Sequence, residues 1–178
     1  MSHLIIPRPE PGEFAPYYTR YIEAVPDGDL LLLLEEGAEE VLNLLRAFGE
    51  ERAGHRYAPG KWSVKEVVGH VADTERVFAY RALRFARGDA TPLPGFEQDA
   101  YVMAAGFDRR SLADLAEEFA DVRKATLKLL AGFDAPALMR SGVASGHPLT
   151  TRAAAWIIAG HEQHHAQVLR ERYLTSGP

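Results

Sequence analysis

The segment AAAWIIAGHEQHHAQVL, residues 153–169, places three histidines in an otherwise largely apolar stretch near the end of the chain. Apolar residues and histidines recur there every three or four positions, at Ala154, Ile158, His161, His165 and Val168. That spacing puts them on one face of an α-helix, with His164 turned about a third of a turn away. Because imidazoles at i and i+4 can converge on one ion, His161 and His165 favour a metal site over a pair of hydrogen-bonded core histidines.

Prolines divide the rest of the chain into four long proline-free stretches, each able to hold one helix. We predict helices over about 29–48, 63–87, 111–132 and 150–174. The second begins at a Ser-x-x-Glu capping box, residues 63–66, which satisfies two backbone amides at a helix start. Apolar residues repeat at helical spacing within all four stretches, as expected for helices that bury one face.

A long connection, residues 89–110, separates the second and third predicted helices and includes a short helical turn at about 97–104. At about 3.3 Å per extended residue it can run back along a helix of about 30 Å, so these two helices need not be antiparallel neighbours. No stretch alternates convincingly with period two. The predicted fold class is therefore all-α, a four-helix bundle with a long crossover between helices two and three.

The composition indicates one soluble domain, 1–178, with an irregular, proline-rich lead-in over about 1–26. A net charge of −5 without a Lys/Arg cluster argues against nucleic acid as a partner. Apolar runs such as the five leucines at residues 30–34 are too short for a signal peptide or a membrane span, so we expect a cytoplasmic protein. With no cysteine in the chain, thiol chemistry would need a thiol supplied from outside.

A third metal ligand is predicted at His70, which lies in the interior of the second helix and can face His161 and His165 across the core. His3 lies close to the terminus, where we expect disorder, while His55 and His147 lie in predicted loops. Three imidazoles leave a coordination position open for water or substrate, which is typical of catalytic zinc. Nickel, iron(II), manganese or cobalt could also bind such a site.

The string His161-Glu162-x-x-His165 also matches the zinc-protease motif, in which the glutamate is the general base. We reject that interpretation because only thirteen residues follow the motif and no strand is available to align an extended peptide. Glu162 lies one position from His161 and so turns about 100° off the ligand face. We expect it to be solvated or at the rim of the site.

Four motifs together resemble the DinB family, and within it the YfiT-like metal-dependent hydrolases and bacillithiol transferases. They are Lys61-Trp62-Ser63-x-x-Glu66, Gly69-His70-Val71-x-Asp73, Leu93-Pro94-Gly95-Phe96 and Ala159-Gly160-His161-x-x-x-His165. The resemblance covers about 27–173. It implies a four-helix bundle, often dimeric, whose three histidines bind a divalent metal, commonly zinc or nickel, and match His70, His161 and His165.

Characterised relatives move a low-molecular-weight thiol onto an electrophile, or isomerise maleylpyruvate with a thiol cofactor. The resemblance therefore implies a metal-dependent enzyme that transfers a bacillithiol-type thiol onto a small electrophilic molecule. The alternatives are a metal-dependent hydrolase that uses metal-bound hydroxide and a non-catalytic metal-binding stress-response module. A homodimer is expected from the family, and no membrane partner is expected.

Two carboxylates, Glu66 and Asp73, lie about one helical turn either side of His70 and could orient its imidazole. The alternative is that they cap or solvate the helix. Trp62 and Trp156 are expected in the core or in a wall, and the aromatic patch around Tyr17 and Tyr21 is expected to pack on the bundle. No catalytic residue is assigned beyond the metal-activated thiol or water.

Overall fold

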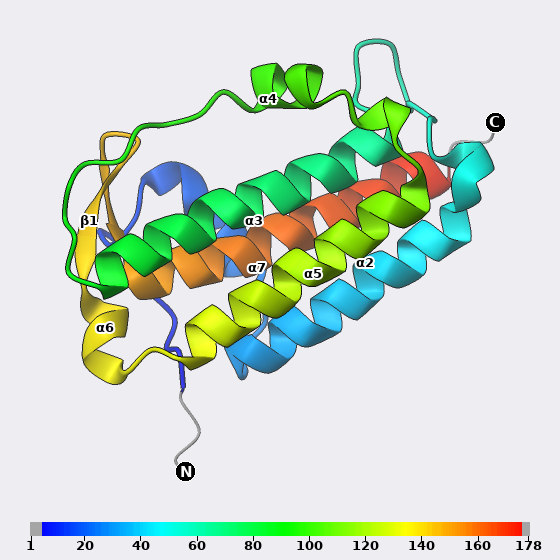
Figure 1. Cartoon of the computed structure of the whole chain (residues 1–178). Coiled ribbons are helices and arrows are strands. Elements are labelled where there is room, and N and C mark those ends of the chain that lie inside the picture. The colour runs from blue at the N-terminus through cyan, green and yellow to red at the C-terminus, as the bar shows by residue number, and fades with distance from the viewer. Residues whose placement is uncertain (1–4, 176–178) are drawn as a thin grey trace.

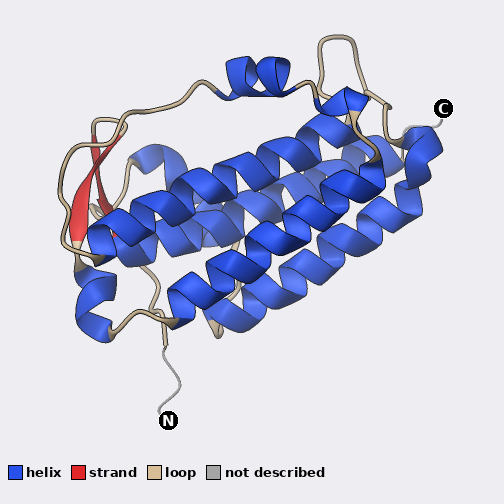
Figure 2. Ribbon diagram, viewed as in Figure 1, coloured by secondary structure: helices blue, strands red, loops and turns tan. Residues whose placement is uncertain are grey.

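Four long helices form the body of the protein in a computed structural model that describes residues 5–175 (Figure 1). They are α2 (Leu30–Arg52), α3 (Val64–Ala86), α5 (Leu112–Ala131) and α7 (Thr151–Val168). Shorter helices complete the fold: η1 (Pro16–Tyr18), α1 (Thr19–Ala24), α4 (Gln98–Ala105), η2 (Phe107–Arg109), α6 (Ala135–Met139) and the π-helical turn η3 (Leu169–Leu174). The prediction of an all-α four-helix bundle is confirmed, with one small hairpin added (Figure 2).

Each long helix begins at a residue whose side chain accepts a hydrogen bond from the first turn. Ser63 accepts from the amide of Glu66, and Glu66 accepts in return from the amide of Ser63, which completes the predicted capping box. Asp29, Ser111 and Thr150 cap the other three helices in the same way. The starts of the four helices are therefore fixed locally, by polar side chains at defined positions.

The long connection between α3 and α5 allows these two consecutive long helices to run parallel, where a short loop would make them antiparallel. α3 and α5 run in the same direction and contact each other, while α2 and α7 run the opposite way (Figure 1). Between α3 and α5 the chain passes back along the bundle and forms α4 on the way. The predicted crossover is confirmed, and it places α4 over one side of the bundle.

Two local predictions are corrected by the structure. The lead-in is not irregular throughout, because Pro16 opens η1 and α1 follows directly, and proline is well suited to a first helical position. The glycine-containing loop before α7 is a hairpin of β1 (Ser141–Ala144) and β2 (His147–Thr150), paired antiparallel. Its two-residue turn has positive φ at Ser145 and Gly146, the geometry that matches strand twist, and strands this short carry no readable alternation.

A polar layer divides the hydrophobic core into two halves. One apolar cluster fills the end of the bundle where α3 ends and α7 begins, around Phe85 and Trp156, and the other fills the opposite end, around Phe119 and Tyr173. Between them lie the buried polar side chains of His70, Thr74, Glu75, Arg123, Thr126, His161 and Glu162. Across residues 5–175 no helix is both long and apolar enough to cross a lipid bilayer.

Candidate metal centre

The structure brings together the three predicted histidines, His70 from α3 and His161 and His165 from α7. One ring nitrogen from each lies within 4.8 Å of the other two. The Nε2 atoms of His70 and His161 are 3.0 Å apart. Two imidazole nitrogens bound to one tetrahedral Zn²⁺ lie about 3.3 Å apart, so this pair needs to separate by only a few tenths of an ångström to share an ion.

Burial keeps these imidazoles neutral and able to donate a lone pair. It lowers the pKa of His70 to about 4. Burial, and then repulsion from neighbouring histidines, also lowers the pKa values of His161 and His165 well below their usual range. Three neutral imidazoles aimed at one point are a donor set that fits a divalent metal of the zinc or nickel type.

The metal-free protein should lose stability as the pH falls from about 6.5 toward 4. An unfolded imidazole protonates near 6.5, whereas folded His70 resists protonation until about 4. Between these values the unfolded state binds more protons, which costs the folded state about 3 kcal/mol for this one residue. Urea unfolding at pH 7 and pH 4.5 measures the effect. His70→Gln should flatten the pH dependence, and an identical dependence in wild type and variant would contradict the assignment.

Thr74, and neither of the two predicted carboxylates, stands beside the second ring nitrogen of His70. The Thr74 hydroxyl lies 3.4 Å from Nδ1 of His70. Glu66 is engaged in the capping box and an ion pair with Arg56, and Asp73 pairs with Arg76. Helical spacing alone cannot show that nearby arginines draw both carboxylates away from the imidazole.

Two aromatic side chains that we expected only to pack are part of the histidine cluster. The ring of Trp62 lies 4.7 Å from that of His70 and is stacked 6.5 Å from that of His165. Tyr21, from α1, packs edge-on against His161. Trp62 therefore forms a wall of the site, which is one of the two positions that we expected for it. Nothing in the sequence pattern around Tyr21 indicated its contact with α7.

The expectation that Glu162 is solvated is wrong. Its side chain is 2% exposed and lies 2.5 Å from Nη2 of Arg123 in α5, which also holds Glu75 of α3 in a two-pronged pair. Burial raises the pKa of Glu162 to about 7, against the opposing attraction of Arg123. Glu162 does turn off the ligand face as the spacing predicted, but that direction leads into the core beside Gly37, not into water.

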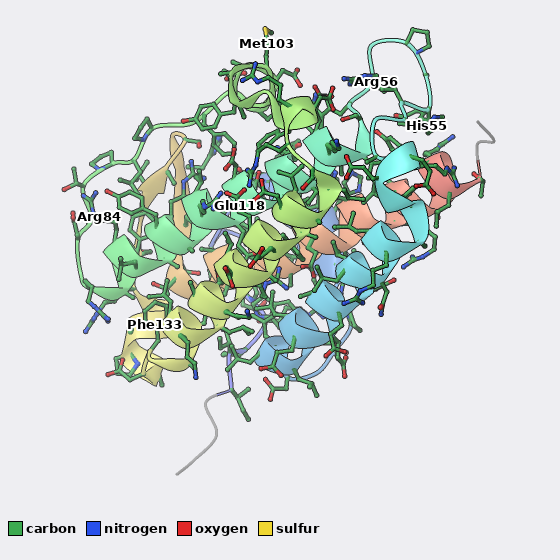
Figure 3. The ribbon with its side chains drawn as sticks, turned by 45° about the vertical axis from the view of Figure 1, so that its right-hand side comes forward. His55, Arg56, Arg84, Met103, Glu118 and Phe133 are labelled. Carbon is green, nitrogen blue, oxygen red and sulfur yellow. The ribbon has the colours of Figure 1, made fainter. Side chains whose placement is uncertain are left out.

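The remaining histidines lie away from the cluster or at its edge. His55 sits in the turn between α2 and α3 (Figure 3). Its ring lies against that of Tyr173. His147 is exposed on β2. His164 is half-buried beside His165, with ring centroids 5.0 Å apart, and does not belong to the three-nitrogen group. His3 lies outside the described residues.

Two clefts reach the histidine cluster. The first, which we call the His165 cleft, has a volume of about 340 Å³ and is lined by His165 and Lys61. The second, the His161 cleft, has a volume of about 280 Å³ and is lined by His161 and His70. Asp99, near the start of α4, lines both. Each cleft therefore gives a small molecule a way to reach at least one of the three histidines.

The comparisons with known proteins agree with this architecture. YfiT from Bacillus subtilis, described as a probable metal-dependent hydrolase with an unusual four-helix bundle topology, superposes with a TM-score of 0.73 at 17% identity, over 90% of this chain and 92% of that one. A mycothiol-dependent maleylpyruvate isomerase superposes with a TM-score of 0.66 at 16% identity, over 83% of this chain. This chain spans 62% of the isomerase, and at such identities both likenesses concern the fold.

No curated protein sequence matches this chain significantly. A family profile does match, over residues 33–169, which include all three histidines and the four long helices apart from the first residues of α2. On this match the chain belongs to the DinB superfamily.

Proposed function

We propose that this protein is a metal-dependent enzyme that transfers a low-molecular-weight thiol onto an electrophilic substrate. The observation that carries the proposal is the pair of clefts that meet at His70, His161 and His165. A transfer reaction brings together two organic molecules at one centre, and each cleft offers space for one of them. The mycothiol dependence of one structural neighbour is in keeping with a thiol as one of the two.

The three histidines would hold the metal, and a bound divalent cation lowers the pKa of a coordinated thiol or water so that its anion forms near neutral pH. Burial holds the imidazoles neutral for this purpose. Thr74 fixes the ring of His70, and Trp62 covers one side of the cluster. The chain has no cysteine, so the nucleophilic sulfur is that of a cosubstrate.

A hydrolase that activates water is the second candidate, favoured by the likeness to YfiT. Hydrolysis brings one organic substrate to the metal, which leaves the second cleft without a role. A purely metal-sequestering module is disfavoured by the same clefts, since storage benefits from a closed site.

Metal-loaded protein should conjugate bacillithiol, mycothiol or glutathione to a generic electrophile such as monobromobimane, at a rate well above the uncatalysed reaction. Removal of the metal with a chelator should abolish this rate, and added Zn²⁺ or Ni²⁺ should restore it. His147→Ala, which changes an exposed histidine on β2, is the matched control and should behave like wild type. If no thiol reacts while an ester or amide is hydrolysed with the same metal dependence, the hydrolase replaces the transferase.

A further inference from the structure

We infer that Tyr17 and Tyr21 form a binding site for an acceptor oxygen of the electrophilic substrate, and that Arg20 is the residue that positions them. The inference rests on the proposed function, which it deepens by naming the substrate class: an electrophile with a carbonyl oxygen beside its reacting carbons. We call these three residues the arm cluster, since they belong to the segment before the bundle.

The arm cluster stands where the reaction would occur. Tyr17 and Tyr21 line the His161 cleft together with His70 and His161. The ring of Tyr21 packs edge-on against His161, with centroids 5.7 Å apart, and the Tyr21 side chain is buried. A molecule in this cleft can therefore contact both the imidazoles and the phenol rings.

Gly160 allows the arm cluster to come this close. A Cβ built at Gly160 would lie 2.0 Å from the backbone oxygen of Tyr21, so any side chain there would push α1 away from α7. Gly160 immediately precedes His161. The contact between the two helices is thus tightest at the point where Tyr21 reaches the histidine, which is what a fixed substrate wall needs.

The hydrogen bonds of the arm cluster leave a donor for a ligand. Nη2 of Arg20 donates to both phenolic oxygens, each at 2.8 Å. The two phenolic oxygens lie 3.4 Å apart, a contact that uses one of their two hydrogens. The second hydrogen can turn to an acceptor in the cleft. Because the positively charged guanidinium donates one hydrogen bond to each phenolic oxygen, it strengthens both phenols as donors.

A donor at this place acts on the charge that the reaction creates. When a thiol adds to acrylamide, the sulfur–carbon bond forms at the terminal carbon, and the electron pair of the C=C bond moves toward the amide oxygen. The thiol proton passes through water to the neighbouring carbon, which completes the product. A hydrogen bond to the amide oxygen stabilises that developing negative charge. In an iodoethane reaction, where iodide leaves, no acceptor oxygen is present and the arm cluster has nothing to hold.

The arm cluster also lies outside the region that the superfamily profile matches, which begins at residue 33. The histidines come from the shared bundle, and the phenols come from a segment that precedes it. This division suits a wall that selects the substrate for a centre whose three histidines lie within the matched region.

Kinetics with two electrophiles test the inference. With the thiol that supports conjugation, Tyr21→Phe should lower kcat/KM for acrylamide by about 100-fold, the effect of removing one donor to a developing oxyanion. The same variant should change the rate with iodoethane by less than about twofold. Tyr17→Phe and Arg20→Met should show the same selectivity. Tyr80→Phe is the matched control, because Tyr80 also accepts from an arginine, Arg84, but lines a groove between α3 and α5.

Binding provides a readout that does not depend on turnover. Propionamide, the unreactive saturated analogue of acrylamide, should shift the NMR signals of ¹³Cζ-labelled Tyr17 and Tyr21 and leave that of Tyr80 unchanged, with and without metal. If propionamide causes these shifts but the protein conjugates no thiol, the binding site at the arm cluster is supported and the proposed function is overturned. If the protein conjugates thiols but shows no such shifts, the proposed binding site is overturned and the proposed function is supported. The same conclusion follows if Tyr21→Phe lowers the rates with acrylamide and iodoethane equally.

Discussion

Single replacement of His70, His161 or His165 by Ala abolishes stoichiometric metal binding, whereas His164→Ala leaves it intact: this is the result we expect from elemental analysis of the purified variants. Each of the three supplies one nitrogen to a group that spans at most 4.8 Å. Loss of one ligand should weaken binding by more than the roughly 10–100-fold typical of residues that only orient ligands. Catalytic activity should disappear with the metal.

His164 is the matched control because it is the same residue type, one position from a ligand and half-buried in the same helix. Its ring lies against Tyr21 and His165, outside the three-nitrogen group. Circular dichroism of all four variants separates loss of metal from loss of fold. Retention of metal by His165→Ala together with its loss in His164→Ala would mean that the ligands are spaced i and i+3 and that the wrong helix face was chosen.

The helical pattern could identify His161 and His165 as neighbours because their geometry depends on one helix alone. His70 could be found by elimination, because it is the only histidine in the interior of a helix other than α7 among residues 5–175. The position of Tyr21 could not be predicted from the sequence, because its place beside His161 depends on how α1 packs against α7 at Gly160. The period of apolar residues shows which face of a helix is buried, but it does not show which distant segment packs against that face.

Glu162 is a second residue whose surroundings could not be predicted from its own helix. The spacing correctly turned it away from the metal face, but a single helix gives no sign of what lies on the other side. There it meets Arg123 of α5, which also pairs with Glu75 of α3. A bundle of four mutually packed helices buries more than one face of α7, so a polar residue off the main stripe is not necessarily in water.

The buried trio of Glu75, Arg123 and Glu162 lies in the same polar layer as the histidines. All three side chains are about 2% exposed, and each comes from a different helix. Glu162 follows His161 directly, so the position of its carboxylate in the core restrains the rotation of α7 about its axis. A further restraint comes from Gly37, where a Cβ would lie 2.1 Å from Oε1 of Glu162. We infer that this layer sets the register of the helices that carry the histidines.

Arg123→Met should lower the free energy of unfolding by about 3–5 kcal/mol, as found when one partner of a buried ion pair is removed. The change retains most of the side-chain volume and leaves two carboxylates buried without a cation. Arg76→Met is the matched control, since Arg76 also pairs with two carboxylates, Asp73 and Glu118, but is half-exposed. Surface pairs of this kind contribute at most about 1 kcal/mol.

Urea denaturation at pH 8 and pH 6 measures the loss in the free energy of unfolding and shows whether buried carboxylates cause it. In Arg123→Met the attraction that opposes burial is gone, so the pKa of Glu162 should rise further above that of the unfolded chain. The folded state then binds the extra proton, and the loss is smaller at pH 6 than at pH 8. Adding Glu75→Gln and Glu162→Gln to Arg123→Met should recover most of the stability and remove this pH dependence. A loss in Arg123→Met no larger than that in Arg76→Met would show that these buried charges do not couple α3, α5 and α7 at the level of the metal centre.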